Sequence, residues 1–196
     1  TYGNKPGEFS SWGDKLATPS SYDPLNFFRT GYNTTTALSI SLGNEKNQTF
    51  ASASSTTAEG IIPNNEYQRY NFTVRNTSNF FNDRMTLDLG FSYVIQKDQN
   101  MLSQGQYFNP IVPLYLFPRG EDFTPYRMYE RYDEGRQLMT QHWPYGEMGM
   151  AMQNPYWIIN RNMFNNDRDR YMANAGLKYK VFDWMDISGR VRIDNA

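Results

Sequence analysis

The stretch Met85–Ile95, MTLDLGFSYVI, alternates between two kinds of side chain with a period of two residues. Every second position is apolar or aromatic, and the positions between are polar or small, except Val94. A period of two over 11 residues predicts a β-strand with chemically opposite faces. At about 3.3 Å per residue and a tilt near 45°, the strand rises roughly 26 Å, which matches the apolar band, about 25 Å tall, of an outer-membrane β-barrel.

A strand of a soluble sandwich shows the same alternation, although such strands usually have about 5–6 residues. The neighbouring segments therefore matter. We expect five further strands in an antiparallel meander, at Thr36–Leu42, Gln48–Thr57, Tyr67–Asn76, Tyr171–Val181 and Met185–Asp194. Gln48–Thr57 alternates poorly and is predicted only because it lies between two clear strands.

Short and long connections alternate along this meander. The short turns are Gly43–Asn47, Ser78–Asp83 and Phe182–Trp184, and the longer connections are Ala58–Glu66 and Gln96–Arg170. Short turns at one end and long loops at the other are typical of outer-membrane barrels. A short helix is also possible at Asp23–Phe28, with Asp23 as its N-cap and Pro24 in its first position.

The composition excludes several classes of function. The net charge of −1 gives no basic field for nucleic acid, and the absence of cysteine removes disulfides, thiolate catalysis and cysteine-based metal sites. No run of 18 apolar residues occurs, so a transmembrane helix is excluded, whereas a membrane barrel is not. The chain starts at Thr1 without Met and ends at Ala196 within a predicted strand, so we expect a piece of a longer protein.

The polar face of the last two predicted strands carries six charged side chains: Lys178, Lys180, Asp186, Arg190, Arg192 and Asp194. A soluble core could not bury these charges without a large desolvation cost. A hydrated barrel interior could hold them, and so could the solvated outer face of a soluble sheet.

Several short segments resemble a known family when they are taken together. They are Asn26–Gly31 (NFFRTG), Leu38–Lys46 (LSISLGNEK), Gly60–Asn64 (GIIPN), Arg69-Tyr70, Asn154–Trp157 (NPYW), and Asp183-Trp184 followed by Gly189-Arg190. Their order and spacing across nearly all of the chain resemble SusC/RagA-like TonB-dependent outer-membrane transporters.

The resemblance implies part of a 22-stranded barrel in the outer membrane of a Gram-negative bacterium, with a SusD-like surface lipoprotein as its lid. It also implies a plug and a TonB-contacting segment, neither of which occurs in these residues, and about six strands cannot close such a barrel. The expected parts are an extracellular loop at 1–35, four barrel strands at 36–95, a long extracellular loop at 96–170, and two strands at 171–196, truncated at the C-terminus. The predicted lipid-facing residues are Met85, Leu87, Leu89, Phe91, Tyr93, Tyr171, Leu177 and Tyr179.

The segment Gln96–Arg170 is the predicted functional loop, because it interleaves aromatic side chains with charged ones. Aromatic faces stack on sugar rings or peptide side chains, while arginines and carboxylates bind hydroxyls or termini. The candidate ligand-binding residues are Tyr107, Phe108, Tyr126, Arg127, Tyr129, Arg131, Tyr132, Trp143 and Tyr145. The alternative is that these aromatics pack the loop on itself, and the resemblance implies a structural role for Tyr156 and Trp157. Leu114–Phe117 is interpreted as a small strand or a lid-facing apolar patch.

Catalytic and metal signals are weak. His142 is the single histidine, and no G-x-S-x-G elbow occurs, so neither a zinc hydrolase nor a serine triad is expected. The acidic pairs Glu121-Asp122 and Asp133-Glu134 are interpreted as solvated surface rather than a glycosidase pair. No cofactor is expected, with calcium at Asn165–Asp169 as an alternative, although the spacing of a calcium loop is missing.

The sequence thus predicts part of a TonB-dependent importer of oligosaccharides, with peptides as the alternative cargo, and not an enzyme. Its expected partners are the lipoprotein lid, TonB acting through the plug, the ligand and outer-membrane lipid. Two alternatives stay open: a soluble or surface-exposed β-rich carbohydrate-binding module, and an outer-membrane adhesin or passive porin.

Overall fold

The computed structural model describes residues 14–18, 21–101, 105, 107–144 and 153–196. The chain divides into two compact units. The sheet unit consists of Tyr32–Glu59, Glu66–Asp98 and Asn165–Ala196, and the loop unit consists of Thr1–Gly31, Gly60–Asn65 and Gln99–Phe164. Each unit is therefore built from segments that lie far apart in the sequence.

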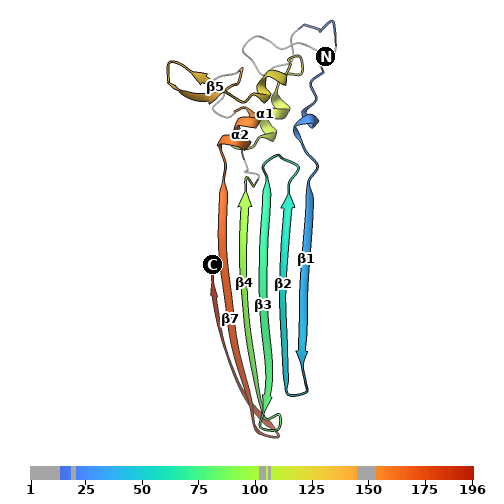
Figure 1. The fold of residues 1–196 in the computed structure, drawn as a ribbon, viewed down its shortest axis with the longest axis vertical. Helices are drawn as coiled ribbons and strands as arrows, with labels where there is room; N and C mark the ends of the chain where they lie inside the picture. The colour runs from blue at the N-terminus through green and yellow to red at the C-terminus, as the bar shows by residue number, and fades with distance from the viewer. Residues whose placement is uncertain (1–13, 19–20, 102–104, 106, 145–152) are drawn as a thin grey trace. The chain divides into compact units, whose positions relative to one another are not determined.

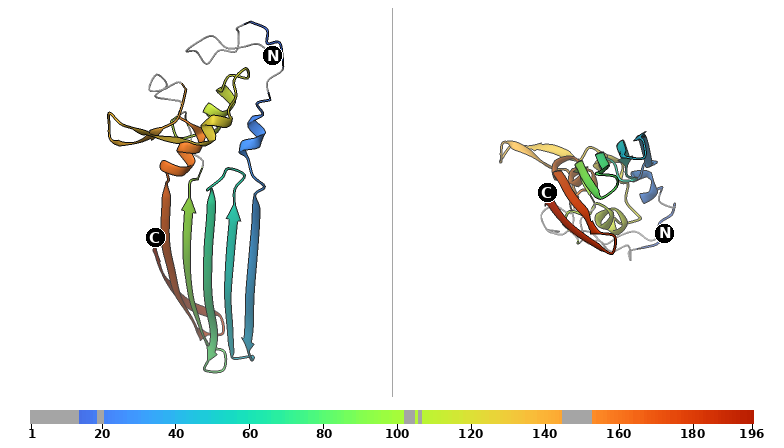
Figure 2. Two further views of the ribbon diagram at one scale, coloured as in Figure 1. Left: turned by 45° about the horizontal axis from the view of Figure 1, so that its top comes forward. Right: turned by 90° about the horizontal axis from the view of Figure 1, so that it is seen from below.

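The sheet unit is an antiparallel meander, as the alternation predicts (Figure 1). Its six strands lie in the order β1-β2-β3-β4-β7-β8. The end-on view in Figure 2 shows that these strands follow a curve rather than one flat plane. The strands are β1 (Tyr32–Gly43), β2 (Asn47–Glu59), β3 (Glu66–Phe80), β4 (Met85–Gln99), β7 (Asn165–Phe182) and β8 (Met185–Asn195).

Four strands are longer than the alternation predicts. β1 begins at Tyr32, β3 continues to Phe80, β4 continues to Gln99 and β7 begins at Asn165, four to six residues beyond the expected bounds. The added ends are mostly polar, so apolar alternation does not reveal them, whereas the backbone hydrogen bonds of a ladder need no particular side chain. The predicted boundaries between loops and strands, at residues 35, 95 and 170, therefore move with the ends of the strands. The connection between β4 and β7 spans residues 100–164.

The predicted short turns lie at one end of the sheet. In the first turn the side-chain oxygen of Asn44 accepts the backbone N–H groups of Lys46 and Asn47, at 2.8 and 2.9 Å. The turn between β3 and β4 is shorter than predicted, because β3 continues to Phe80. It places Phe81, Asn82 and Asp83 in the left-handed region, with φ of 54°, 56° and 63°.

The sheet unit has no hydrophobic core of its own. Among its described residues, Ser78 and Gly176 are the buried ones, and neither contributes apolar packing. Backbone ladders alone do not stabilise a sheet in water, since sheets require at least one covered hydrophobic face. In the described residues, the apolar face of this sheet is exposed.

The loop unit contains short elements. They are the 3₁₀ helices η1 (Pro24–Phe27) and η2 (Thr124–Arg127), the helices α1 (Ile111–Leu116) and α2 (Pro155–Arg161), and the hairpin strands β5 (Glu130–Asp133) and β6 (Leu138–Gln141). The predicted N-cap is confirmed, because an Asp23 side-chain oxygen accepts the Leu25 N–H at 2.9 Å. The segment Leu114–Phe117 is not a strand, because it forms the end of α1. Leu114 and Phe117 are 1% exposed and pack inward, whereas Tyr115 and Leu116 are 46% and 45% exposed.

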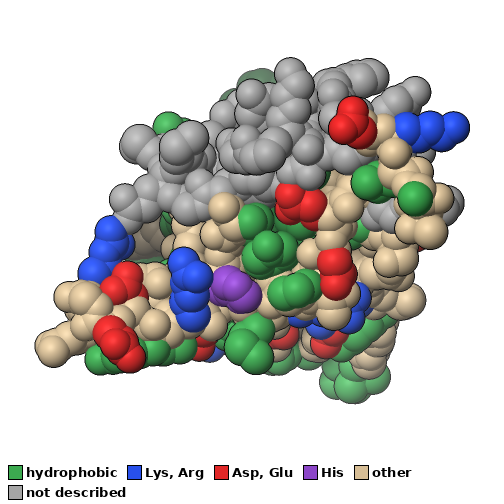
Figure 3. Space-filling model, turned by 90° about the horizontal axis from the view of Figure 1, so that it is seen from above, with side chains coloured by type: hydrophobic (Ala, Val, Ile, Leu, Met, Phe, Trp, Pro, Cys, Tyr) green, Lys and Arg blue, Asp and Glu red, His purple; other side chains and the backbone are tan. Residues whose placement is uncertain are grey.

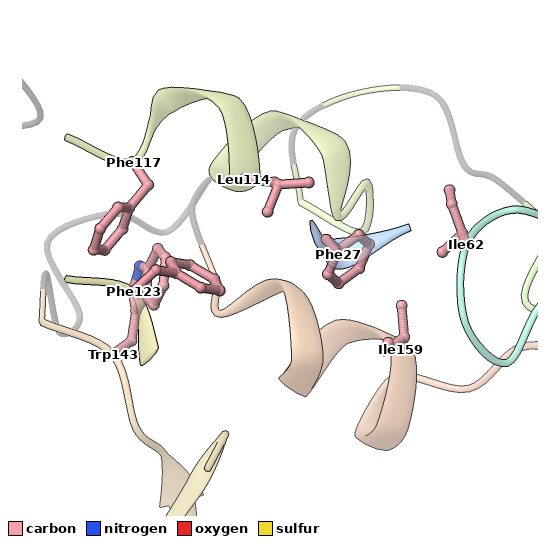
Figure 4. Packing of buried hydrophobic residues seen from close by; sticks show 7 residues of the cluster. All are labelled: Phe27, Ile62, Leu114, Phe117, Phe123, Trp143 and Ile159. Carbon is pink, nitrogen blue, oxygen red and sulfur yellow. The ribbon is translucent and has the colours of Figure 1, made fainter. Parts of the chain in front are cut away.

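Aromatic packing forms the core of the loop unit (Figure 4). Phe117 and Phe123 meet edge to face, with ring centroids 4.9 Å apart, and Tyr22 stacks on Phe123 at 5.1 Å. The loop therefore packs on itself, which is the alternative that the sequence left open. The buried cluster consists of Phe27, Ile62, Leu114, Phe117, Phe123, Trp143 and Ile159.

Asparagine side chains join the segments of the loop unit. Asn64 donates to the Ile159 carbonyl and to the Asn160 side chain, both at 3.0 Å, and Asn65 donates to the Asn100 carbonyl at 2.7 Å. Arg29 donates to the carbonyls of Gly60 and Asn65 at 3.0 and 3.1 Å. Three segments that carry the family resemblance, 26–31, 60–64 and 154–157, therefore belong to one unit.

Asn154 holds the start of α2 in place. Its side chain donates to the carbonyls of Tyr126 and His142 at 2.7 and 2.8 Å and accepts the Tyr156 N–H at 2.8 Å. The residue is fully buried, so these bonds replace the water that a buried amide loses. This arrangement supports the structural role expected for the segment Asn154–Trp157.

In the described part of the chain, no helix has both the length and the apolar character needed to cross a membrane.

Candidate functional site

The apolar side chains of all six strands form one continuous surface, which we call the apolar belt. On the N-terminal strands, Leu38, Ala53 and Phe72 lie opposite one another in one row of the sheet. On the C-terminal strands, Ala173 lies opposite Ile193. Large belt residues are 42–76% exposed: Leu38, Ile40, Phe72, Val74, Leu89, Phe91, Leu177, Tyr179, Val191 and Ile193.

Two observations show that the belt is continuous from β3 across β4 to β7. Thr73 and Ser92 share a hydrogen bond at 3.2 Å on the opposite face, which brings the next belt residues, Val74 and Phe91, side by side. A shallow apolar hollow of about 470 Å³ is lined by residues of β3, β4, β7 and β8 together. The predicted lipid-facing residues Met85, Leu87, Leu89, Phe91, Tyr93, Tyr171, Leu177 and Tyr179 thus share one face, and all of them are exposed or half-exposed.

The opposite face of the sheet is polar and ion-paired. Arg170 pairs with Asp194 at 2.6 Å, and Lys178 pairs with Asp186 at 2.8 Å. Thr77 donates to the Asp88 carboxylate at 2.7 Å. The charges that the alternation assigned to the polar face therefore lie there as predicted.

Aromatic residues lie towards both ends of the belt. Tyr70, Tyr93 and Tyr171 lie towards the end remote from the short turns. At the turn end, Phe182 and Trp184 stack with centroids 5.5 Å apart and planes 7° apart, and Trp184 is 81% exposed. Side chains with an apolar ring and a polar tip favour a boundary between hydrocarbon and water.

Some of the predicted ligand-binding residues are exposed on the surface, and others lie in the core of the loop unit. Trp143 is 3% exposed and packs against Phe117, so it belongs to the core and not to an open binding surface. Tyr126 is half-buried beside it. Arg127 and Arg131 are exposed, as are the aromatic residues Tyr107, Phe108 and Tyr132, whereas Tyr129 is half-buried and Tyr145 lies outside the described residues.

These candidates do not converge on one site. Phe108 packs edge to face against Phe164 at 5.3 Å, while Arg131 and Tyr132 lie on the hairpin strand β5. Acidic, basic and apolar side chains lie side by side on the face of the molecule in Figure 3, without a segregated charge. Of the predicted ligand residues that the structure describes, Arg127 lines the pocket described next, and the others do not.

A small polar pocket opens on the loop unit, with a cavity volume of about 60 Å³. Its walls come from η1, from the segment that leads into η2, and from the first turn of α2. The buried rings of Phe27 and Phe123 contribute its apolar part. The polar groups at its walls belong to Asp23, Asn26, Asp122, Arg127 and Tyr156.

The local fold fixes the two carboxylates of the pocket. An Asp122 oxygen accepts the Thr124 N–H at 2.9 Å, as an Asp23 oxygen accepts the Leu25 N–H. Hydrogen bonds from the Thr124 side chain and backbone lower the pKa of Asp122, so it is ionised at neutral pH. Burial raises the pKa of Tyr156, and the nearby Arg127 charge partly offsets this rise.

Local sequence patterns do not reveal most of this pocket. They predict a helix cap at Asp23 and solvated surface at Asp122, and the family resemblance implies a structural role for Tyr156. The sequence does indicate a local role for both carboxylates. Asp23 and Asp122 each precede a short turn that contains proline, and each can accept a backbone N–H of that turn. That Asp23 lines the same pocket as Asp122 and Arg127 is a consequence of the tertiary fold that no local pattern encodes.

No group of three or more histidine or acidic side chains in the described residues could hold a metal ion. The segment Asn165–Asp169, where calcium was the alternative, forms the extended start of β7. The ring nitrogen Nδ1 of His142 lies 3.0 Å from the Met128 carbonyl oxygen.

The apolar belt and the polar pocket are the two candidate functional features of the described residues. No protein-family model matches the chain, and no curated protein is significantly similar to it.

Proposed function

We propose that this chain forms part of the wall of an outer-membrane β-barrel that imports a small polar nutrient. The barrel is of the 22-stranded, TonB-dependent class and works with a SusD-like surface lipoprotein. The cargo class expected from the sequence is an oligosaccharide or a peptide. The single observation that carries this proposal is the apolar belt, which nothing in the described residues covers.

The belt is costly in water and favourable in lipid. Isolated apolar residues on a surface need no explanation, but a continuous apolar face across six strands marks a contact with lipid or protein. Hydrocarbon around these side chains removes the hydrophobic penalty, at about 25 cal/mol per Å² of apolar surface. The ion-paired opposite face suits a hydrated lumen.

The dimensions of the belt favour lipid over a protein partner. Along β4 the belt runs from Met85 to Ile95, and it rises roughly 26 Å at a tilt near 45°. This height corresponds to the apolar band of a barrel, about 25 Å tall. The aromatic residues towards both ends, Tyr93 at one and Trp184 at the other, correspond to the interfacial girdles of such barrels.

The two outer edges of the sheet require further strands. Among the described residues, no strand pairs with the outer edge of β1 or of β8. Unpaired N–H and C=O groups are not tolerated in hydrocarbon, because no water is present to satisfy them. A barrel of more than six strands is therefore part of the proposal.

The transport part of the proposal rests on the resemblance to SusC/RagA-like proteins. Three segments that carry it lie within the loop unit, where hydrogen bonds join Arg29 to Gly60 and Asn65. A rigid loop unit supports ligand capture at the membrane surface better than a disordered segment would. TonB and the lipoprotein lid enter on the resemblance alone.

Site-directed spin labelling tests the membrane part. Residues 1–196 contain no cysteine, so each single-cysteine variant introduces one nitroxide within this part of the protein. In native membranes, a label at Leu89 is expected to be relaxed by lipid-soluble oxygen and protected from a water-soluble nickel chelate. A label at Ser92, on the opposite face, should show the reverse. Equal accessibility of both labels to the nickel chelate would overturn the membrane assignment and favour a soluble binding module.

Uptake measurements test the transport class. Cells that produce the protein should accumulate labelled oligosaccharide or peptide, and a protonophore should abolish the accumulation, because TonB draws on the proton gradient of the inner membrane. Accumulation that is unchanged by the protonophore would contradict the TonB-dependent class and favour a passive porin.

A further inference from the structure

The polar pocket of the loop unit holds opposite charges that do not neutralise each other. Asp23 and Asp122 lie on its walls together with Arg127. Among the described residues, Arg127 forms no ion pair with either carboxylate. Two anionic groups and one cationic group thus line the same small pocket.

We propose that this pocket binds a small zwitterion, namely an amino acid or a short peptide with free ends. Its ammonium group binds between the carboxylates of Asp23 and Asp122, and its carboxylate binds Arg127. The inference rests on the proposed import function, and it selects peptide-type cargo over sugar at this pocket.

The size of the pocket argues against a sugar ring. Its volume of about 60 Å³ is far below the roughly 300–1,000 Å³ of pockets that enclose drug-sized ligands. The charged ends of a small zwitterion can contact the walls of so small a pocket, while the rest of the ligand remains outside it.

The aromatic rings of the pocket are also poorly placed for stacking on a sugar. Phe27 and Phe123 are 4% and 7% exposed, and the Tyr22 ring stacks on Phe123. Sugar recognition by aromatics requires an open ring face, which these rings do not offer. They supply the apolar part of the pocket wall, beside the exposed charged groups of Asp23, Asp122 and Arg127.

The polar groups are pre-arranged for charged termini. One oxygen of Asp23 and one of Asp122 are occupied by backbone N–H groups, which orients the second oxygen of each carboxylate without a rearrangement on binding. The guanidinium of Arg127 suits bidentate binding of a carboxylate. The Tyr156 hydroxyl and the Asn26 amide line the same pocket and provide neutral hydrogen-bonding groups.

The test is calorimetric titration of the native protein in detergent with dialanine, dialanine amide and N-acetyl-dialanine. Alanine side chains are chosen because the pocket is small. We expect saturable binding of dialanine, and Arg127→Gln should weaken it about tenfold or more. The same variant should leave the affinity for dialanine amide unchanged, because that ligand has no carboxylate to lose.

Asp122→Asn provides the converse test. It should weaken the binding of dialanine and leave that of N-acetyl-dialanine unchanged, since the acetylated ligand has no ammonium group. Asparagine still accepts the Thr124 N–H, so the turn is preserved. Matched controls are Arg131→Gln and Glu134→Gln, which alter exposed residues that do not line the pocket and should not change affinity.

Two results would overturn the proposal: no saturable binding of dialanine by the unmodified protein, or equal weakening of all three ligands by Arg127→Gln. The spin-label experiment on the belt is independent of these titrations. Loss of the pocket proposal with a lipid-accessible Leu89 would leave the membrane assignment standing. Ligand binding with a water-accessible Leu89 would remove the membrane assignment and retain the pocket.

Discussion

An arginine scan along β4 tests the membrane assignment quantitatively. The central variant is Leu89→Arg, and the depth of Leu89 follows from the strand geometry. It lies four residues from Met85 and six from Ile95. At about 3.3 Å per residue and a tilt near 45°, these separations correspond to depths of roughly 9 Å and 14 Å from the two borders of the belt. In the proposed barrel, Leu89 is therefore expected near the bilayer midplane.

The expected cost depends on this depth. Arginine on the lipid face costs about 2–4 kcal/mol at the midplane and about 0–1 kcal/mol near the interfaces. Leu89→Arg should therefore lower the folding equilibrium constant by roughly 30-fold to 700-fold. Met85→Arg and Ile95→Arg, at the borders of the belt, should lower it far less.

Ser92→Arg is the control on the opposite face of the same strand. Its expected cost is that of the hydrogen bond between Ser92 and Thr73, about 0.5–1.5 kcal/mol, because a charged side chain remains hydrated in the lumen. The assay is reversible urea unfolding of the native protein in lipid vesicles, followed by tryptophan fluorescence. A flat profile across Met85, Leu89 and Ile95 would refute the depth argument. Equal costs at Leu89 and Ser92 would refute the assignment of the two faces.

Three further predictions concern the loop unit. Asn154→Ala removes three hydrogen bonds and leaves buried carbonyl groups without donors. It should therefore lower the free energy of unfolding of the loop unit by about 3 kcal/mol or more, measured by thermal unfolding. The control Asn33→Ala, at an exposed position of β1, should have little effect. Asn64 has φ of 62°, so Asn64→Ala should destabilise more than Asn64→Gly in urea unfolding, by about 1–2 kcal/mol, because glycine tolerates the left-handed region. Burial raises the pKa of Tyr22 well above its ordinary value of 10.0, so its contribution to stability is complete below pH 10 and is lost as the pH rises further. Tyr22→Phe should make the fall in stability above pH 10 less steep, and an unchanged pH profile would contradict this attribution.

Local periodicity was sufficient to predict most strands of the sheet, but not the residues at which the strands begin and end. The alternation of Met85–Ile95 predicts a two-faced strand because the parity of a residue fixes its side in an extended chain. The polar end of β4 beyond Ile95 has no such signal, and it extends because the backbone ladder continues. The strand β2 was predicted from its neighbours alone, and its alanines complete the belt between Leu38 and Phe72.

The sequence by itself determined the strands, their two faces and the aromatic character of the long connection, because these follow from the order of residues within short windows. The tertiary structure alone decided that Trp143 lies in the core, that belt residues of distant strands lie side by side, and that Asp23, Asp122 and Arg127 line one pocket. The physical reason is the range of the interactions. A face is set by the backbone of a few consecutive residues, whereas burial and charge pairing depend on contacts between segments that are separated by up to about a hundred residues in the chain.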